Sequence, residues 1–169
     1  AESQLLDFDD LLLRPVRLLE GNEEVRLRFA SRFATVLVDE YQDTNQLQYR
    51  LARVIARDHG DICVTGDPDQ SIYRWRGADI RNILEFERDF TGARVVKLEE
   101  SYRSTNVILR AASAVIRNNR SRIERDLRSS LGDGERIRVL CASTEEAEAR
   151  RIVEGVRAAL NDGYRATDV

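Results

Sequence analysis

The stretch VLVDEYQDTN, residues 36–45, joins a short apolar run to three carboxylates. Its first three residues, Val36 to Val38, are typical of a strand buried on both faces, as in parallel sheets. Asp39 and Glu40 follow at once, and Asp43 comes after two further residues. Ligands of open α/β sheets bind beyond the carboxyl ends of the strands. These acids therefore lie where an open α/β sheet would place its ligand-binding and catalytic residues.

The segments after this stretch continue a strand and helix alternation. Residues 44–60 have apolar positions at helical spacing, 62–66 (ICVTG) form a second apolar run, a helix is expected around 80–86, and 94–98 (RVVKL) form a third run. This order predicts an α/β fold with an open parallel sheet. Residues 5–34 are predicted to be helical, with interruptions at Pro15 and at 20–24.

A second unit is expected after residue 98. The sequence predicts a helix over 105–118, a strand over 136–141 (RIRVLC), and a last helix with apolar residues from Ala149 to Leu160 on one face. The length of 169 residues leaves room for one domain or for parts of two. The predicted organisation is a helical segment at 1–34, the main α/β part at 35–98 and the start of a second unit at 99–169.

The composition predicts a soluble chain. Hydrophobic residues make up 42% of the sequence, yet no apolar run approaches the roughly 18 residues of a membrane helix. The N-terminal AESQLLDFDD is acidic where a signal peptide would be basic. We therefore expect an intracellular, cytoplasmic chain without membrane contact. Cys63 and Cys141, each within an apolar run, are expected to be buried thiols of a reducing compartment.

An apolar strand that ends in Asp-Glu is the Walker B pattern of phosphate-cleaving ATPases. The aspartate, here Asp39, holds a hydrated Mg²⁺, and the neighbouring glutamate, here Glu40, polarises the attacking water. Neighbouring side chains at a strand end diverge, so one can face the metal while the other reaches the water. On these residues alone, a pair of surface acids without such a role is the alternative.

The second apolar run leads into GDPDQSIYRWRGA, residues 66–78, which mixes acids, an amide, aromatic rings and arginines. Its Tyr73, Trp75 and Arg76 suit single-stranded nucleic acid, whose bases stack on rings and whose phosphates meet guanidinium groups. The alternative is that Trp75 belongs to the core. In LEESYRST, residues 98–105, Tyr102 and Arg103 could stack a purine and touch a terminal phosphate, or the segment could only cap the next helix.

In this order, VLVDEYQDTNQLQY, VTGDPDQSIYRWRGADIRNILEFERDF and LEESYRSTNVIL closely resemble motifs II, III and IV of the UvrD/Rep/PcrA family, superfamily 1 DNA helicases that move 3′ to 5′. The opening LLDFDDLLL resembles the family segment that returns from an inserted helical subdomain to the first RecA-like domain. The resemblance implies a RecA-like parallel sheet of the P-loop NTPase fold, incomplete here, and the start of a second RecA-like domain. It fades after about Glu135.

The resemblance also implies roles for single residues. Asp39 would bind Mg²⁺, Glu40 would activate the hydrolytic water, and Gln70 would sense the γ-phosphate of ATP. Tyr102 would stack on adenine, and Arg103 would act as an arginine finger. The implied partners are single-stranded DNA and 3′-tailed duplex DNA, and the implied DNA contacts are Tyr73, Trp75 and Arg76.

A phosphate-binding loop is missing from the sequence. No G-x-x-x-x-G-K-[ST] occurs, and the single lysine, Lys97, lies in the strand-like VVKLEE. The chain is therefore expected to be an internal segment of a larger helicase, one that by itself neither hydrolyses ATP nor unwinds DNA. Uncovered apolar surface is expected to cause self-association. A further departure is Ser101, where many family members have asparagine, which affects only a local hydrogen bond.

Two other functions fit parts of the sequence. A non-catalytic nucleic-acid or partner-binding module would keep the aromatic and arginine surface without ATPase activity. A metal-dependent nuclease could use clustered carboxylates, although no lysine or histidine base lies near them; these are Asp39, Glu40, Asp43, Asp67 and Asp69. A solvated face, rather than a DNA contact, is expected for five arginines: Arg117, Arg120, Arg122, Arg125 and Arg128.

Overall fold

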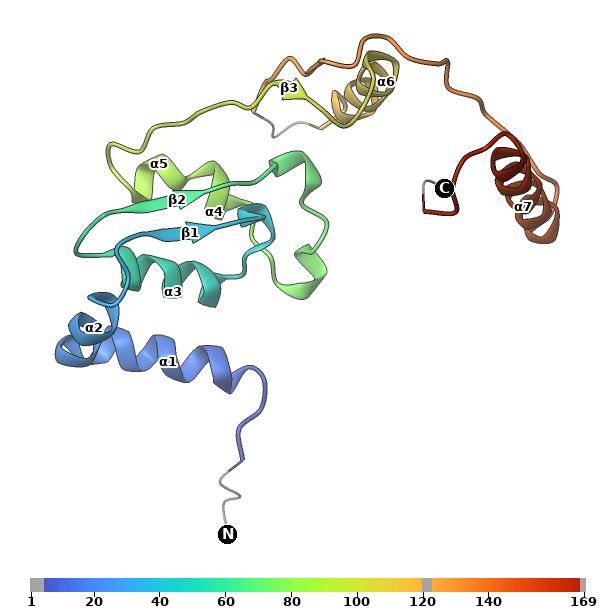
Figure 1. The fold of residues 1–169 in the computed structure, drawn as a ribbon. Helices are drawn as coiled ribbons and strands as arrows, with labels where there is room; N and C mark the ends of the chain where they lie inside the picture. The colour runs from blue at the N-terminus through green and yellow to red at the C-terminus, as the bar shows by residue number, and fades with distance from the viewer. Residues whose placement is uncertain (1–4, 120–122, 168–169) are drawn as a thin grey trace.

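The computed structural model describes residues 5–119 and 123–167, and the chain begins with two helices, α1 (Asp10–Gly21) and α2 (Glu23–Ala30) (Figure 1). The break between them lies in the predicted interval 20–24. There the side-chain oxygen of Asn22 accepts a hydrogen bond from the amide of Val25 at 3.0 Å and caps α2. Pro15 does not interrupt α1, contrary to the prediction. Burial of Val16 and Leu19 in the next turn outweighs the one amide donor that proline lacks.

A two-stranded parallel sheet follows these helices. β1 (Val36–Val38) pairs with β2 (Ile62–Val64), with Val36 opposite Ile62 and Val38 opposite Val64. α3 (Gln46–Ala56) connects the strands and packs against α1 and β1. The predicted α/β order with a parallel sheet is therefore present. The buried apolar side chains of the three helices form a core: Val16, Leu19, Ala30, Ala52, Val54 and Ala56.

One face of the sheet is open to solvent. Leu37 and Cys63 are register partners on this face, and both are exposed, Leu37 at 75%. The prediction that Cys63 is buried is therefore wrong, because its side of the sheet is the one that the described residues leave uncovered. The prediction for Cys141 is also wrong, since this thiol is exposed in a segment that forms no strand.

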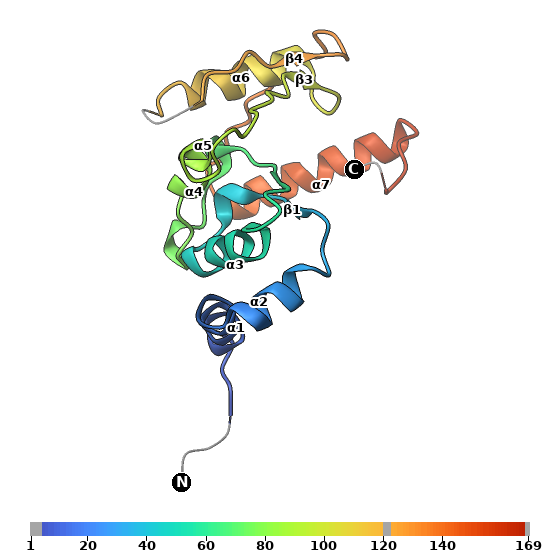
Figure 2. The same ribbon diagram turned by 90° about the vertical axis from the view of Figure 1, so that its left-hand side faces the viewer.

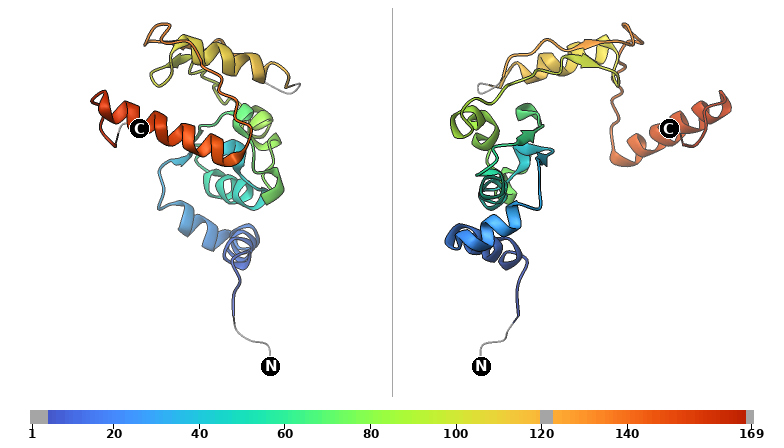
Figure 3. Two further views of the ribbon diagram at one scale, coloured as in Figure 1. Left: turned by 90° about the vertical axis from the view of Figure 1, so that its right-hand side faces the viewer. Right: turned by 60° about the vertical axis from the view of Figure 1, so that its left-hand side comes forward.

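The predicted helix around 80–86 is two short helices, α4 (Arg81–Leu84) and α5 (Phe86–Asp89). A second unit then follows, in which β3 (Glu100–Ser101) pairs in parallel with β4 (Arg128–Ser129) and α6 (Asn106–Ile116) packs on β4. Figure 2 shows the order from bottom to top: the α1 and α2 pair, the sheet with α3, and the unit of β3, β4 and α6. α7 (Glu145–Asn161) stands apart from these elements in Figure 1 and in the right-hand view of Figure 3.

Helices α6 and α7 lie where the sequence predicts them, but two predicted strands do not form. Residues 94–98 and 136–141 have no strand conformation. An apolar run becomes a strand only where a neighbouring strand takes up its backbone hydrogen bonds. Neither run has such a neighbour in the described part of the chain, and Val95, Leu98 and Val139 stay exposed at 54%, 80% and 83%.

Candidate functional site

The end of β1 turns sharply between its two acids. Glu40 has φ 50° and ψ 42°, the one positive φ among the described non-glycine residues. A left-handed conformation costs such a residue about 1 kcal/mol or more, and strained positions of this kind cluster at functional sites. η1 (Tyr41–Asp43) follows, closed by the amide of Asp43, which donates to the carbonyl of Glu40 at 2.9 Å. The two acidic side chains therefore do not continue the alternation of the strand.

The carboxylate of Asp39 is exposed and suited to a hard cation. Its Oδ1 accepts hydrogen bonds from the hydroxyl of Thr65 and from the amide of Glu40, the latter at 2.9 Å. These bonds, that of Thr65 first, lower the pKa of Asp39 below its ordinary value. Mg²⁺ in nucleotide sites is typically held by one or two carboxylates together with waters and substrate phosphates. Asp39 is therefore suited to be the single protein ligand of a Mg²⁺ ion.

Asp43 adds a second feature to this turn. Its Oδ1 is buried and has no hydrogen-bond partner among the described residues. A buried carboxylate oxygen without a donor is unfavourable unless a water donates a hydrogen bond to it or a cation binds it. Within the described ranges, no group of three or more histidine, cysteine, aspartate or glutamate side chains is placed to hold a metal by itself.

The end of β2 lies directly beside the end of β1. The ladder continues past both strands, because the amide of Thr65 donates to the carbonyl of Val38 at 2.8 Å and the amide of Tyr41 donates to the carbonyl of Thr65 at 2.9 Å. The next turn, η2 (Pro68–Gln70), is capped by the side chain of Asp67. Gln70, predicted to sense the γ-phosphate, donates from its amide to Oδ2 of Asp67 at 2.7 Å. The structure thus brings the Asp39 and Gln70 turns to one edge of the sheet.

The same aspartate binds an arginine from the second unit. Nη2 of Arg125 lies 2.6 Å from Oδ2 of Asp67 and 3.5 Å from Oδ2 of Asp69. Burial, the largest single influence, would raise the pKa of Asp67, but the hydrogen bonds from Arg125 and Gln70 together hold this pKa below its ordinary value. Two of the five carboxylates of the nuclease hypothesis therefore face a guanidinium group.

This ion pair corrects the prediction of a solvated arginine face. Arg125 is partly buried, with 24% of its side chain exposed, because two acids from a distant loop fold onto it. Arg117 and Arg128 are exposed, as predicted. Arg120 and Arg122 lie outside the described residues.

The loop after η2 presents aromatic rings and a guanidinium group to solvent. η3 (Arg74–Arg76) is closed by Gly77, whose φ of 88° favours glycine. The rings of Tyr73 and Trp75 lie 6.4 Å apart between centroids, and Cζ of Arg76 lies 5.5 Å and 5.2 Å from their respective centroids. Trp75 is 78% exposed. The alternative that Trp75 is a core residue is therefore wrong.

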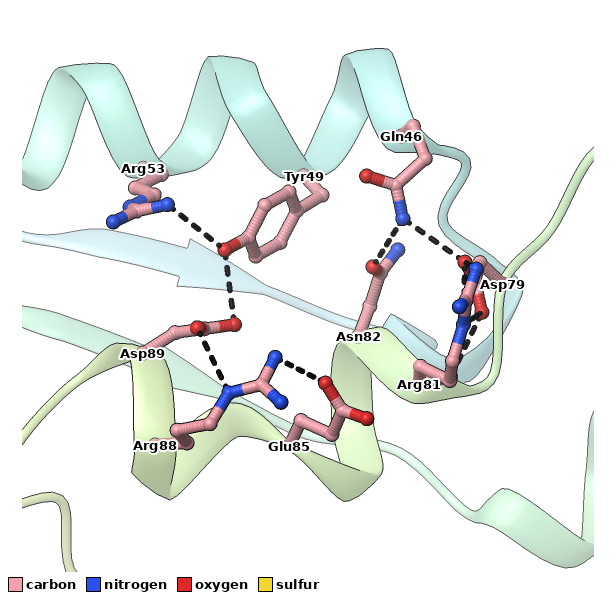
Figure 4. Close-up of polar contacts among 9 residues, drawn as sticks. All are labelled: Gln46, Tyr49, Arg53, Asp79, Arg81, Asn82, Glu85, Arg88 and Asp89. Carbon is pink, nitrogen blue, oxygen red and sulfur yellow. Dashed lines mark hydrogen bonds and ion pairs between the residues drawn. The ribbon is translucent and has the colours of Figure 1, made fainter.

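A polar network holds the end of this loop against α3 (Figure 4). Nε2 of Gln46 on α3 donates to Oδ2 of Asp79 and to Oδ1 of Asn82, both at 3.0 Å. Asn82 is buried, and its own amide donates to the carbonyl of Thr44 at 3.0 Å. Further along, the hydroxyl of Tyr49 donates to Asp89 at 2.9 Å. The hydrogen bond of Arg81 is the main cause that lowers the pKa of Asp79 to about 2.

Tyr102 and Arg103 lie just after β3, on the second unit. Tyr102 is 73% exposed, and its hydroxyl donates to Glu100 at 2.9 Å, which raises its pKa. Oγ of Ser101 accepts hydrogen bonds from the amides of Arg103 at 3.4 Å and Ser104 at 3.3 Å, so the short side chain still orders this turn. In the described structure no hydrogen bond or ion pair joins Tyr102 or Arg103 to the strand ends that carry Asp39 and Gln70.

Sequence reasoning missed Gln42 and assigned Arg125 to a solvated face. Gln42 is 1% exposed and lies between the two strand ends. No periodicity indicates a buried amide within a turn, so only its place inside the acidic motif could have drawn notice. Arg125 stands 58 residues after its partner Asp67, and no local pattern links residues so distant in sequence.

With this geometry established, comparison with known proteins identifies the family. The family described as UvrD/REP helicase N-terminal domain matches residues 1–91, and the UvrD-like helicase C-terminal domain matches residues 96–169. The chain belongs to the UvrD/Rep/PcrA-type helicases. No helix in the described part of the chain is long and apolar enough to cross a membrane.

Bacterial relatives resemble the chain closely over most of its length. It is 43% identical over 155 residues to the ATP-dependent DNA helicase Rep of Buchnera aphidicola, covering 92% of this chain and 24% of the relative. It is 47% identical over 150 residues to DNA helicase II of Rickettsia typhi, covering 89% of this chain and 23% of the relative. It is 42% identical over 169 residues to the ATP-dependent DNA helicase PcrA of Staphylococcus aureus, covering 100% and 23%. The chain thus spans about a quarter of the length of these relatives.

Proposed function

We propose that residues 1–169 are part of an ATP-dependent DNA helicase of the cytoplasm, one that couples ATP hydrolysis to 3′-to-5′ movement on single-stranded DNA and to the unwinding of 3′-tailed duplexes. Family membership and relatives named ATP-dependent DNA helicase support the proposal. In it, residues 1–34 return from a helical subdomain, 35–98 form the latter part of a first RecA-like domain, and 99–169 begin a second.

In this proposal, residues that follow β1 and β2 carry out ATP hydrolysis. Asp39 holds Mg²⁺, which when bound neutralises charge on the phosphate oxygens of ATP. Glu40 orients the attacking water and accepts its proton. Gln70 hydrogen-bonds the γ-phosphate, and its present partner Asp67 keeps the amide at the edge of the sheet. The open position of the Asp39 carboxylate supports this assignment.

The second unit supplies the remaining groups in the proposal. Tyr102 stacks on the adenine, and Arg103 meets the charge that develops on the terminal phosphate. Their high exposure supports roles in binding, since neither is held by core packing. Because they stand on a separate unit, the two units must close on the nucleotide for the site to be complete.

The aromatic loop is the DNA surface in this proposal. Tyr73 and Trp75 stack on bases, and Arg76, lying over both rings, contacts a phosphate of the same strand. The loop shares its polypeptide with Gln70, three residues before Tyr73. A change at the γ-phosphate therefore reaches the DNA contacts over a short path.

One observation carries the proposal: the Asp39 and Glu40 turn and the loop of Gln70, Tyr73 and Trp75 leave neighbouring parallel strands at the same sheet edge. The test is phosphate release by the longest open reading frame that contains residues 1–169. We expect hydrolysis that rises with added oligo(dT) and Mg²⁺, and loss of hydrolysis in Glu40→Gln. An active enzyme in which Glu40→Gln retains full hydrolysis would overturn the assignment.

The 169-residue chain itself is proposed to be inactive and to self-associate through its open sheet face, where Leu37 is 75% exposed. Phosphate release by this chain alone would refute the first statement, and a monomer by light scattering at all concentrations would refute the second. Oligo(dT) binding by the chain, with no ATPase activity in the longer reading frame, would instead favour a non-catalytic binding module.

A further inference from the structure

Gln42 is a buried amide that joins the two strand ends. It is 1% exposed, whereas Glu40 on one side is open to solvent and Asp67 on the other is partly buried. Its Nε2 donates to Oε2 of Glu40 at 2.7 Å, and its Oε1 accepts from the backbone amide of Asp67 at 3.0 Å. The backbone carbonyl of Gln42 also accepts a hydrogen bond from the hydroxyl of Ser71 at 3.4 Å. Both ends of the side chain are therefore committed.

The backbone at Gly66 lies directly against the side-chain amide of Gln42. Gly66 passes so close that a Cβ at this position would lie 2.5 Å from Oε1 of Gln42 and 3.1 Å from the amide nitrogen of Tyr41. Real Cβ atoms essentially never lie so close to a neighbour, so any side chain at position 66 would displace the amide of Gln42. Tyr41, also 1% exposed, anchors the turn on the other side.

The chemistry of the site requires an amide. One end of the side chain must donate to a carboxylate, and the other must accept from a backbone N–H. Glutamate at position 42 could not donate to Glu40 when ionised, and methionine would leave the Asp67 amide without an acceptor. Glutamine supplies both groups at the required length.

We propose that Gln42 is a positioning residue for the carboxylate of Glu40, which it holds in register with the β2 loop that carries Gln70. This inference rests on the proposed function, in which Glu40 orients the attacking water. A glutamate side chain has several rotatable bonds, and Glu40 is otherwise exposed. Misplacement of a catalytic group by about 1 Å can cost about 100-fold in rate. The hydrogen bond from Gln42 removes this freedom.

The test compares two variants with a matched control in the longest reading frame that contains the chain. Gln42→Met removes both hydrogen bonds at similar volume, and Gln42→Glu removes only the donor. Gln48→Met is the control, because Gln48 is exposed and accepts one structural hydrogen bond from the amide of Asn45 at 2.9 Å, without contact to Glu40. Hydrolysis is measured with oligo(dT) and Mg²⁺ at saturation.

We expect both Gln42 variants to lower kcat by about 10- to 100-fold while KM for ATP changes less than about twofold. Gln48→Met should leave both constants unchanged. Combined with Glu40→Gln, the Gln42→Met change should lower single-turnover hydrolysis no further, because the group that it positions is already lost. Independently of activity, hydrogen exchange of the segment 66–71 should be faster in Gln42→Met than in Gln48→Met.

The outcomes separate the inference from the proposed function. A wild-type enzyme without ATPase activity would overturn the proposed function and this inference with it. An active wild type in which Gln42→Met keeps kcat within twofold would overturn the inference alone. The inference would also be overturned if the loss of single-turnover hydrolysis caused by Gln42→Met added in full to the loss caused by Glu40→Gln. Full additivity is expected when a residue has a purely structural role. Unchanged exchange of segment 66–71 would also overturn the inference.

Discussion

Replacement of Asn82 by alanine should destabilise the main α/β unit, because this side chain joins the turn after β1 to the end of the aromatic loop. Asn82 is 4% exposed. Its amide donates to the carbonyl and the hydroxyl of Thr44, at 3.0 Å and 3.2 Å, and its Oδ1 accepts from Gln46 at 3.0 Å. Alanine removes three buried or partly buried hydrogen bonds at once.

The size of the loss in free energy of unfolding depends on which hydrogen bonds the partners of Asn82 retain. A typical hydrogen bond contributes about 1 kcal/mol net, so three would give about 3 kcal/mol. The carbonyl of Thr44 still accepts from the amide of Asp79 at 3.0 Å, and Gln46 still donates to Asp79, so neither is left without a partner. The loss in free energy of unfolding should therefore be about 2 to 3 kcal/mol. For a chain of this size the corresponding fall in Tm is about 4 to 12 °C.

Urea unfolding of the 169-residue chain, followed by far-UV circular dichroism and by the fluorescence of its one tryptophan, Trp75, measures this loss. Asn118→Ala is the matched control. Asn118 is exposed and makes one hydrogen bond, to the carbonyl of Val115 at 2.9 Å, so its loss should cost less than about 0.5 kcal/mol. Equal stability of Asn82→Ala and wild type, or an equal loss in Asn118→Ala, would refute the reasoning.

Three further predictions concern binding, pH and exposure. Trp75→Ala should weaken oligo(dT) binding by the longer reading frame about 10-fold in fluorescence anisotropy, and Trp75→Phe should weaken it less, because one stacked base contributes about 1 to 3 kcal/mol; equal affinities would contradict the stacking role. The pKa of Asp79 is lowered to about 2, so its contribution to stability is present above its ordinary pKa near 4 and is lost as pH falls through about 2. Asp79→Asn should reduce the fall of the urea midpoint between pH 5 and pH 2.5, and an unreduced fall would count against the ion pair with Arg81. Cys63 lies exposed on the open sheet face, through which the chain is proposed to self-associate, so in the native Cys141→Ser variant it should react slowly with a disulfide reagent at high protein concentration and at the rate of a free thiol on dilution; a rate independent of protein concentration would contradict self-association through this face.

The local signals in the sequence were enough for the elements with strong caps and periodicity. Asn45 and Gln48 form a capping box at the start of α3, and Thr144 accepts from the amide of Ala147 at the start of α7. Such signals lie within a few residues of each other and act without the rest of the fold. The helices α3 and α7 were predictable for this reason, and α6, which has no side-chain cap, was predictable from its apolar periodicity.

The apolar runs were a weaker guide, because a strand depends on a partner that local sequence does not reveal. β1 and β2 formed where predicted, since each provides the other's hydrogen bonds. The runs at 94–98 and 136–141 are also rich in apolar residues, although each carries two basic residues, and they have no strand conformation in the described structure. Predicted burial of Cys63 failed for a related reason, because composition does not tell which face of a sheet is covered.

The sequence by itself determined most of the helices, the parallel pair β1 and β2, the family, and the residues proposed for chemistry, because these depend on motifs of a few consecutive residues. In VLVDEYQDTN it marked Asp39 and Glu40 but offered no reason to single out Gln42. Only the tertiary structure placed Gln42 between Glu40 and the amide of Asp67, and Arg125 against the acids of a loop 58 residues earlier. These contacts depend on how the two parallel strands align and how the second unit lies on the first, which no local pattern of residues encodes.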